Sequence, residues 1–349
     1  MSRVINTGIA SYGMSGRIFH APFIQQNPNF KLSAIVERHK DNSRELYPES
    51  KLYRSFEEMI ADDSIELVVV NTPVQMHFDY AKKALLAGKS VIVEKPFTTI
   101  AQEAKELDEI AKTNNTFLSV YQNRRYDGDF LELKKIIETN LLGELKEAEL
   151  KFDRYRPGHS GKEHKEGDKP GAGNLHDLGA HLIDQALQLF GMPEAVFADL
   201  ECMRPGLTSN DYFEVLLFYP SKLRVRIKGS VYVKERTFSY ILNGENGSFL
   251  QKRSDLQEEA LEKGAIPSLE SWIETPGDFD GLLHTTIEGI EIRKETRSAI
   301  GNYMNYYQDI YKALTGAAPN PVPAADAVKT MTIIDAALQS AKEKRVINL

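Results

Sequence analysis

The first third of the chain alternates short apolar runs with amphipathic segments. Five runs rich in valine and isoleucine predict strands, and apolar and polar residues barely alternate within them. Strands that are buried on both faces of a parallel sheet have this pattern. The predicted strands are residues 4–9, 31–37, 66–71, 90–94 and 116–121. Helical patterns separate them at residues 55–61, 77–87 and 99–113, which predicts a doubly wound α/β domain.

After about residue 122 the pattern changes. A helix is predicted at 129–138, followed by a polar stretch rich in glycine and proline at 156–173. The next predicted helix, 175–190, ends at Gly191, and the last covers 324–344. Between them, alternating runs predict strands at 212–219, 223–231 and 237–243, with turn residues at 243–247. We therefore expect a doubly wound α/β domain over 1–122 and, over 123–349, an α+β domain with an open, mostly antiparallel sheet.

Composition narrows the class of protein. The 349 residues are 42% hydrophobic and 27% charged, which suits two soluble domains. A net charge of −7 does not fit a nucleic-acid-binding surface. No apolar run approaches the roughly 20 residues of a membrane span, and no signal-peptide pattern is present. With Cys202 as the single cysteine, we expect a cytoplasmic enzyme without membrane or nucleic-acid partners.

The first predicted strand leads through a turn into a predicted helix. A dinucleotide-binding fold carries G-x-G-x-x-G at this point; here Ser11 takes the place of the first glycine, and Gly13 and Gly16 keep the others. Gly13 lets the backbone approach a pyrophosphate, Gly16 permits close helix–strand packing, and the helix start directs N–H groups at phosphate. An ordinary tight turn is the alternative. We interpret the turn as a cofactor site that comprises Ser11, Tyr12, Gly13, Met14, Ser15 and Gly16.

Glu37 ends the second predicted strand, about 20 residues beyond the turn, where an acidic residue binds the ribose hydroxyls. Arg38 follows it, and an arginine at this place can bind a 2′-phosphate. Because Glu37 would repel that phosphate, the pair favours NAD over NADP and leaves NADP as the alternative.

Three further motifs follow along the chain: Asn71-Thr72-Pro73 with His77, then Glu94-Lys95-Pro96, then Asp177 with His181. They resemble, in kind and order, those of the glucose–fructose oxidoreductase/inositol dehydrogenase (Gfo/Idh/MocA) family, and the resemblance covers essentially the whole chain. It is closest to a subgroup that includes bacterial NADP-dependent scyllo-inositol dehydrogenases, most clearly over 12–22, 118–130 and 176–193. Two departures are Ser11 and Glu37, the latter standing where the subgroup prefers a small residue before the arginine.

The resemblance implies a Rossmann domain followed by an open-sheet domain that forms a homodimer or homotetramer. It also implies reversible oxidation of a secondary alcohol on a polyol or sugar, with an inositol as the best single expectation. Cofactor contacts would come from four motif residues, Thr72, Pro73, His77 and Glu94.

Lys95 directly follows a predicted buried strand, at the sheet edge where doubly wound folds bind ligands. A partly desolvated lysine has a lowered pKa and can hydrogen-bond a substrate oxygen. The alternative is an ordinary surface lysine. In the family this lysine is catalytic, the peptide bond before the following proline is often cis, and Glu94 would orient the site.

Asp177 and His181 are four residues apart and so share one face of a predicted helix. A histidine can accept a proton near neutral pH, so we assign His181 as the general base for a substrate hydroxyl. Asp177 would bind substrate and orient the imidazole. Gly179 in this helix indicates a close approach by a neighbour, and a solvated polar pair is the alternative interpretation.

Several other residues complete the expected site. Asn123 and Arg125, at the end of the last predicted strand, could reach cofactor, and Asn123 and Tyr155 could reach substrate. The stretch 157–173 is either a loop that closes over substrate or an inert connector. We expect no metal, because Asp177 and His181 have no third ligand at suitable spacing.

Two other functions remain open. The chain could be a cofactor-binding sensor without catalysis, although such proteins usually lose the lysine or the Asp–His pair. It could also be a glycoside-cleaving enzyme that uses NAD transiently.

Overall fold

The computed structural model describes residues 3–270, 272–273 and 278–349, and these form two compact units. The N-terminal unit comprises the described residues of 1–123, 257–273 and 302–328. The C-terminal unit comprises those of 124–256, 274–301 and 329–349. The sequence predicts one division of the chain, between residues 122 and 123. In the structure two later segments, 257–273 and 302–328, also belong to the N-terminal unit.

The N-terminal unit is built on a six-stranded parallel sheet with the order β3-β2-β1-β4-β5-β6. Strands β4 and β5 are buried almost throughout, which explains their unbroken valine and isoleucine runs. Five strands were predicted, and the sixth, β3, has only three residues. The strands are β1 (Ile5–Ile9), β2 (Phe30–Val36), β3 (Lys51–Tyr53), β4 (Leu67–Val70), β5 (Ser90–Val93) and β6 (Leu118–Val120).

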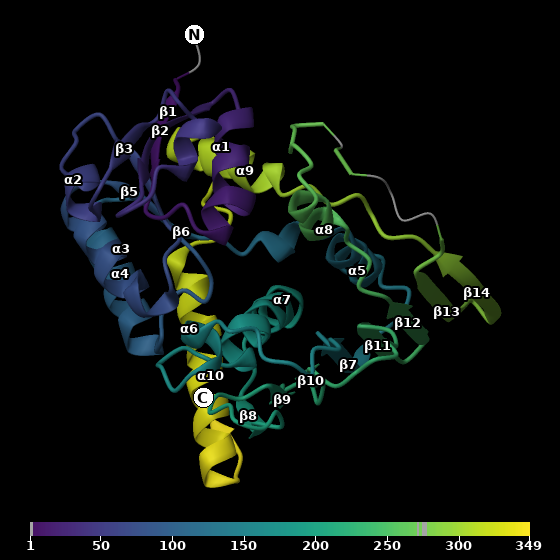
Figure 1. Ribbon diagram of the computed structural model, residues 1–349. Coiled ribbons are helices and arrows are strands. Elements are labelled where there is room, and N and C mark those ends of the chain that lie inside the picture. The colour runs from purple at the N-terminus through teal and green to yellow at the C-terminus, as the bar shows by residue number, and fades with distance from the viewer. Residues whose placement is uncertain (1–2, 271, 274–277) are drawn as a thin grey trace. The chain divides into compact units, whose positions relative to one another are not determined.

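Helices cover both faces of this sheet. Helices α3 (His77–Leu86) and α4 (Ala101–Thr113) lie side by side on one face, and α1 (Ala21–Gln26) packs on the other (Figure 1). The short helix α2 (Phe56–Ile60) begins at Ser55, whose hydroxyl and backbone form a capping box with Glu58. This arrangement is the doubly wound α/β fold that the sequence predicts.

The returning segments complete the N-terminal unit. Helix α8 (Gln257–Glu262) and helix α9 (Met304–Leu314) were not predicted. Tyr306 and Tyr307 of α9 are fully buried in this unit. The edge strand β6 also gains a late partner, because the N–H of Val120 donates to the carbonyl of Val322 at 3.1 Å. Helix α10 (Ala324–Glu343) then continues from this unit into the C-terminal unit.

The C-terminal unit is built on a nine-stranded sheet with the order β14-β13-β12-β11-β7-β10-β9-β8-β15. Strand pairs are antiparallel except for β10 with β7, so the expectation of an open, mostly antiparallel sheet is confirmed. The residues at 243–247 form the predicted hairpin between β11 and β12. The strands are β7 (Leu145–Lys151), β8 (Ala195–Glu201), β9 (Tyr212–Phe218), β10 (Arg224–Ser230), β11 (Tyr240–Gly244), β12 (Gly247–Gln251), β13 (Gly281–Ile287), β14 (Ile290–Thr296) and β15 (Ile347–Asn348).

The helix predicted at 175–190 is two different elements. Residues Leu175–Gly179 form a π-helical turn, and helix α7 (Ala180–Phe190) continues from it to Gly191. A Cβ on Gly179 would lie 2.9 Å from Leu175 Cδ1 and 3.5 Å from the ring of Phe213 on β9. The close approach that the glycine indicated is therefore present, and it comes from the sheet and from the turn itself. The remaining helices of this unit are α5 (Gly128–Glu138) and the short α6 (Glu163–Glu166).

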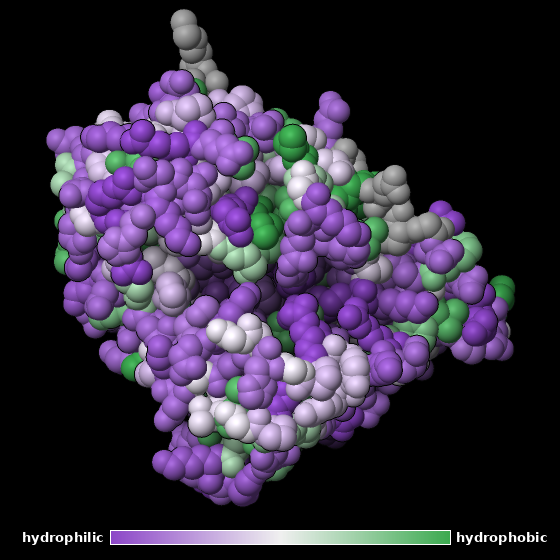
Figure 2. Space-filling model, in the orientation of Figure 1, coloured by the Kyte–Doolittle hydropathy of each residue, from purple (hydrophilic) through white to green (hydrophobic). Residues whose placement is uncertain are grey.

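One face of the molecule is mostly polar (Figure 2). Figure 2 shows a largely hydrophilic face on which hydrophobic residues form small scattered groups. Within the part of the chain that the structure describes, no helix is both long and apolar enough to cross a membrane.

Candidate functional site

Strands β2 and β3 are added on one side of β1, and β4, β5 and β6 on the other side. The place between β1 and β4 is therefore the topological switch point, where doubly wound folds bind ligands. Asn71, just after β4, bridges it. Its Oδ1 accepts the N–H of Ser11 at 2.9 Å, and its Nδ2 donates to the carbonyl of Ser11 at 2.7 Å. The asparagine of the Asn-Thr-Pro motif thus fixes the turn after β1. Sequence reasoning quoted Asn71 as part of a motif and did not assign it this role.

The geometry of this turn shows how serine replaces the first glycine. Ser11 does not adopt a left-handed backbone conformation, and its Oγ accepts the N–H of Gly13 at 3.2 Å. Gly13 is exposed, and a Cβ there would lie no closer than 3.4 Å to a neighbour. A Cβ on Gly16 would lie only 2.2 Å from the carbonyl oxygen of Ser11. Gly16 is therefore required for packing, whereas Gly13 leaves the backbone open to a ligand.

Glu37 and Arg38 lie at the end of β2. The Glu37 carboxylate is buried and accepts hydrogen bonds from the N–H of Ser43 at 2.9 Å and from its hydroxyl at 2.6 Å. The N–H of Asn42 also reaches it at 3.3 Å. Glu37 therefore holds the following loop, while Arg38 is exposed. The expected contact of Glu37 with the ribose hydroxyls remains a prediction.

Two other expected cofactor residues follow β4. Thr72 Oγ1 is buried and has no hydrogen-bond partner among the described residues, so it can accept or donate to a ligand. His77 is buried between two backbone carbonyls, that of Thr72 at 2.8 Å from Nε2 and that of Pro96 at 2.9 Å from Nδ1. Burial is the main cause that lowers the pKa of His77. The ring thus joins two loops of the site, and Pro73, exposed between them, borders the same edge.

Glu94 and Lys95 follow β5, and the Lys95–Pro96 peptide bond is cis, as the family resemblance implies. Burial alone would raise the pKa of Glu94, but hydrogen bonds from His20 and Ser15 lower it to about 2. Glu94 also accepts the N–H of Lys95 at 3.0 Å. Since Ser15 belongs to the turn after β1, this carboxylate connects the expected phosphate-binding turn to the expected catalytic lysine.

Asp177 and His181 belong to the C-terminal unit. His181 is 3% exposed at the start of α7, and Asp177 is half-buried in the π-helical turn before it. The Asp177 carboxylate accepts a hydrogen bond from Lys165 Nζ at 2.8 Å. The two residues therefore lie on a π-helical turn and the α-helix that continues it, rather than on one continuous α-helix, and their expected shared face stays a prediction. The loop residue Lys165 was not singled out from the sequence.

The remaining expected residues differ in exposure. Asn123 is buried at the end of the first continuous segment of the N-terminal unit. Arg125 donates to both carboxylate oxygens of Asp184 at 2.8 and 2.6 Å, a buried two-bond ion pair within the C-terminal unit. Tyr155 is 48% exposed, with Lys234 over its ring. The proposed ligand contacts of these residues stay predictions.

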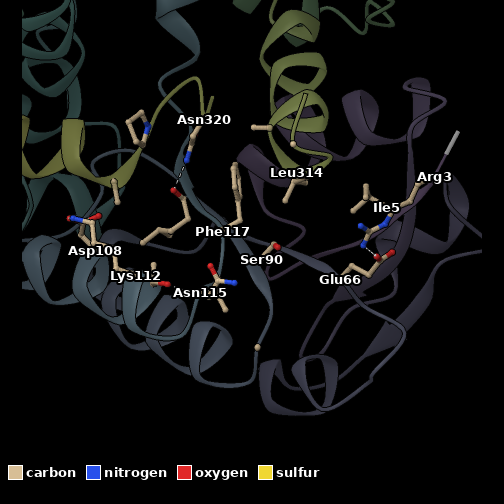
Figure 3. A pocket seen from close by; sticks show the side chains of 18 residues that line it. Arg3, Ile5, Glu66, Ser90, Asp108, Lys112, Asn115, Phe117, Leu314 and Asn320 are labelled. Carbon is tan, nitrogen blue, oxygen red and sulfur yellow. Dashed lines mark hydrogen bonds and ion pairs between the residues drawn. The ribbon is translucent and has the colours of Figure 1, made fainter. Parts of the chain in front are cut away.

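A pocket of about 700 Å³ lies elsewhere in the N-terminal unit (Figure 3). It borders the starts of β1, β5 and β6, which is the opposite edge of the sheet from the turn after β1. Its charged residues already form ion pairs, Arg3 with Glu66 and Lys112 with Asp108. We therefore place the candidate site at the carboxyl edge. In the described ranges, no group of three or more His, Cys, Asp or Glu residues is arranged to hold a metal ion.

The parallel sheet, its switch-point turn and the appended mixed sheet define a dinucleotide-binding protein of two units. The chain belongs to the Gfo/Idh/MocA oxidoreductase family. Residues 5–122 match the model of the family's NAD-binding Rossmann fold, and residues 134–349 match that of its C-terminal alpha/beta domain.

Individual relatives match over their whole length. Oxidoreductase YdgJ of Escherichia coli strain K12 is 39% identical, with both chains fully covered. The scyllo-inositol 2-dehydrogenase (NADP(+)) IolW of Bacillus subtilis strain 168 is 37% identical, over 99% of this chain and 96% of that one. A crystal structure of an oxidoreductase from Bacteroides fragilis NCTC 9343 is 44% identical with a TM-score of 0.90, covering 99% and 100% of the two chains.

Proposed function

We propose that this oxidoreductase is an NAD(P)-dependent dehydrogenase that oxidises a secondary alcohol of a polyol or sugar, with an inositol as substrate. The observation that carries the proposal is the Glu94 carboxylate, which bonds both Ser15 of the open turn and the backbone of Lys95. One buried group thereby ties a turn suited to a dinucleotide to a lysine suited to an alcohol oxygen. The similarity to a scyllo-inositol dehydrogenase supports the substrate class.

The chain offers groups that fit a dinucleotide cofactor. The exposed backbone at Gly13 and the Thr72 hydroxyl lie after adjacent strands β1 and β4, and this hydroxyl has no hydrogen-bond partner among the described residues. Ser15 and Gly16 begin the helical segment whose N–H groups suit phosphate. When bound, the cofactor supplies the acceptor for the hydride that leaves the substrate carbon.

Protein side chains would handle the substrate oxygen and its proton. Lys95 donates a hydrogen bond to the oxygen of the reacting alcohol, and His181 accepts the hydroxyl proton as the C–H bond breaks. Asp177 binds a neighbouring hydroxyl and orients the imidazole. These three residues are the ones we propose as catalytic.

We also propose a preference for NADP, although the residues at the end of β2 favour NAD when they are considered as sequence alone. The buried Glu37 carboxylate already accepts hydrogen bonds from Ser43 and Asn42, so its oxygens are less available to the ribose hydroxyls that an NAD-selective acidic residue would bind. Arg38 remains exposed beside it. Arg38→Ala should raise the KM for NADP about tenfold or more, the loss of one charge-assisted hydrogen bond. An equal effect on NAD would contradict this assignment.

The deciding experiment measures reduction of NAD and NADP by the purified protein over a panel of inositols and aldoses. Reduction with an inositol, abolished in both Lys95→Ala and His181→Ala while cofactor still binds, supports the proposal. Tight cofactor binding without reduction of any panel member would favour a sensor instead. Consumption of sugar glycosides without net reduction would favour glycoside cleavage.

We propose further that two copies associate through the C-terminal sheet. Along the strands of this sheet, side chains that are at least partly exposed alternate with buried side chains. Seven of these exposed positions pair with one another from strand to strand and form a row across the sheet. An Arg–Glu ion pair lies at the centre of the row, with apolar residues on both sides. Leu216→Lys should yield monomers in light scattering while the unfolding temperature stays near that of the wild type. The row comprises Phe197, Leu216, Arg226, Glu149, Ile241, Leu250 and Leu282.

A further inference from the structure

His20 lies at the centre of a buried hydrogen-bonded cluster in the N-terminal unit. The side chain is fully buried, at the end of the π-helical segment Gly16–His20 that follows the turn after β1. Its Nε2 is 3.0 Å from Glu94 Oε1, and its Nδ1 is 2.7 Å from the hydroxyl of Tyr307. The ring also packs against that of Tyr121, with 4.5 Å between centroids. Both ring nitrogens are thus engaged by residues far away in the sequence.

The chemistry of its neighbours gives this cluster a direction. Glu94 is ionised, because its pKa is lowered to about 2, so its oxygens only accept hydrogen bonds. His20 must therefore donate from Nε2. Burial raises the pKa of Tyr307 well above its usual value, so the phenol keeps its proton. When the imidazole carries one proton, Nδ1 accepts from Tyr307, and the donors run from Tyr307 through His20 to Glu94.

The carboxylate of Glu94 passes this constraint to two places in the site. Oε1 also accepts the hydroxyl of Ser15, in the turn after β1, and Oε2 accepts the N–H of Lys95. A buried carboxylate held by three donors has little freedom to rotate. A change in the His20 bond would consequently alter the position of both Ser15 and Lys95.

We propose that His20, itself fixed by Tyr307, is a positioning residue that holds the Glu94 carboxylate between the cofactor turn and Lys95. This inference rests on the proposed dehydrogenase function. Helix α9, which returns to the N-terminal unit late in the chain, thereby controls the geometry of the reactive edge through a single hydroxyl. A histidine that merely fills the core would affect stability and nothing else.

The adjacent tyrosines of α9 provide a matched pair of variants. Tyr307→Phe removes the hydroxyl that bonds His20. Tyr306→Phe removes an equally buried hydroxyl, which lies 3.2 Å from Ser119 Oγ, and keeps the ring that packs against Tyr121 and Tyr307. For each variant the unfolding temperature, the Kd for NAD and NADP by calorimetry, and kcat with the best substrate are measured on the full chain.

We expect both variants to lower the unfolding temperature to a similar extent. Tyr307→Phe should in addition raise the cofactor Kd several-fold and lower kcat about tenfold, whereas Tyr306→Phe should leave both near the wild-type values. Equal Kd and kcat in the two variants, at similar unfolding temperatures, would overturn the proposal. The cofactor Kd is measured without turnover. A wild-type protein that binds the cofactor but does not reduce it would overturn the proposed function, and the Kd values of the two variants would still test the role of His20.

A double-variant cycle tests the route through Glu94. If His20 acts through this carboxylate, Tyr307→Phe should have no further effect on cofactor Kd once Glu94→Gln is present. Additive effects would show that the route is wrong. His20→Gln supplies a second entry to the cycle, since its side-chain amide can still donate to Glu94 and should retain more of the cofactor affinity than His20→Leu.

Discussion

The side-chain amide of Asn71 holds both backbone polar groups of Ser11, accepting its N–H at 2.9 Å and donating to its carbonyl at 2.7 Å. The ends of the neighbouring strands β1 and β4 are joined in this way at the topological switch point of the sheet. The pair fixes the turn before any ligand arrives, and the cofactor then binds to a backbone that is already ordered.

Asn71→Ala should therefore weaken both folding and cofactor binding. Losing two hydrogen bonds at a buried amide is expected to lower the free energy of unfolding by about 2 kcal/mol. Cofactor Kd should rise about tenfold, because the turn must now be ordered on binding. Denaturant unfolding and calorimetry measure the two effects. Asn71→Asp keeps the acceptor and adds a negative charge, so its Kd should be higher still; a Kd below that of Asn71→Ala would contradict a phosphate site here.

Substitution by alanine should affect a different property at each of the two glycines of the turn, namely stability at Gly16 and cofactor binding at Gly13. At Gly16 the added Cβ would meet the Ser11 carbonyl oxygen at 2.2 Å, so we expect a loss of about 3 kcal/mol in the free energy of unfolding. At Gly13 the nearest neighbour is at 3.4 Å, so folding should be unaffected while cofactor Kd rises. Thermal unfolding with and without NADP separates the two. Equal loss of stability in both variants would mean that Gly13, too, serves packing alone.

The ionisation of Glu94 should make stability depend on acid pH. Its pKa is lowered to about 2 in the folded protein, against about 4.3 in an unfolded chain. The ionised form then contributes stability that is fully present above pH 4.3 and is lost as the pH falls towards 2. The contribution is on the order of 3 kcal/mol.

The measurement is the difference in unfolding free energy between wild type and Glu94→Gln at several pH values. This difference should shrink as the pH is lowered from 5 to 3. A difference that stays constant over this range would show that Glu94 does not titrate with folding.

Lys165 should affect substrate more than stability. Its ion pair with Asp177 is partly exposed, so Lys165→Met is expected to cost less than about 1 kcal/mol in unfolding free energy. If Asp177 binds substrate, loss of its partner should raise the KM for the polyol several-fold and leave the KM for cofactor unchanged. Lys162→Met, an exposed lysine three residues earlier, is the control. Matching KM values in the two variants would assign Lys165 to the surface.

The sequence predicts the layers of the fold because these depend on local patterns. Buried strands such as β4 and β5 are continuous apolar runs, and helix α3 ends two residues before Gly88, which has a positive φ. The short strand β3 has no such signal, since its three residues pair through the backbone with β2. The π-helical turn before α7 is not predicted either, because residues 175–190 read as one continuous helical pattern in the sequence.

The same distinction between local patterns and distant contacts applies to the residues of the candidate site. Motif residues such as Lys95 and Gly13 could be found from spacing, whereas the partners that fix them could not. His20 lies within residues 12–22, a stretch that carries the family resemblance, but its bonds join it to Glu94, 74 residues away, and to Tyr307, 287 residues away. Glu37 shows the converse case, in which the expected position holds and the carboxylate is engaged by a nearby loop.

The bond between Val120 and Val322 bears on how the chain is made. Strand β6 is an edge strand, and the segment that covers it leaves the ribosome about 200 residues later. Until then the nascent N-terminal sheet presents an open edge, a surface on which other chains can pair. Residues 329–349 belong to the other unit, so the N-terminal unit lacks its last segment until residue 328 is made, and the C-terminal unit needs residues made later still. A message cut short before Val322 would therefore yield a chain with two unfinished units rather than one intact domain and one damaged domain.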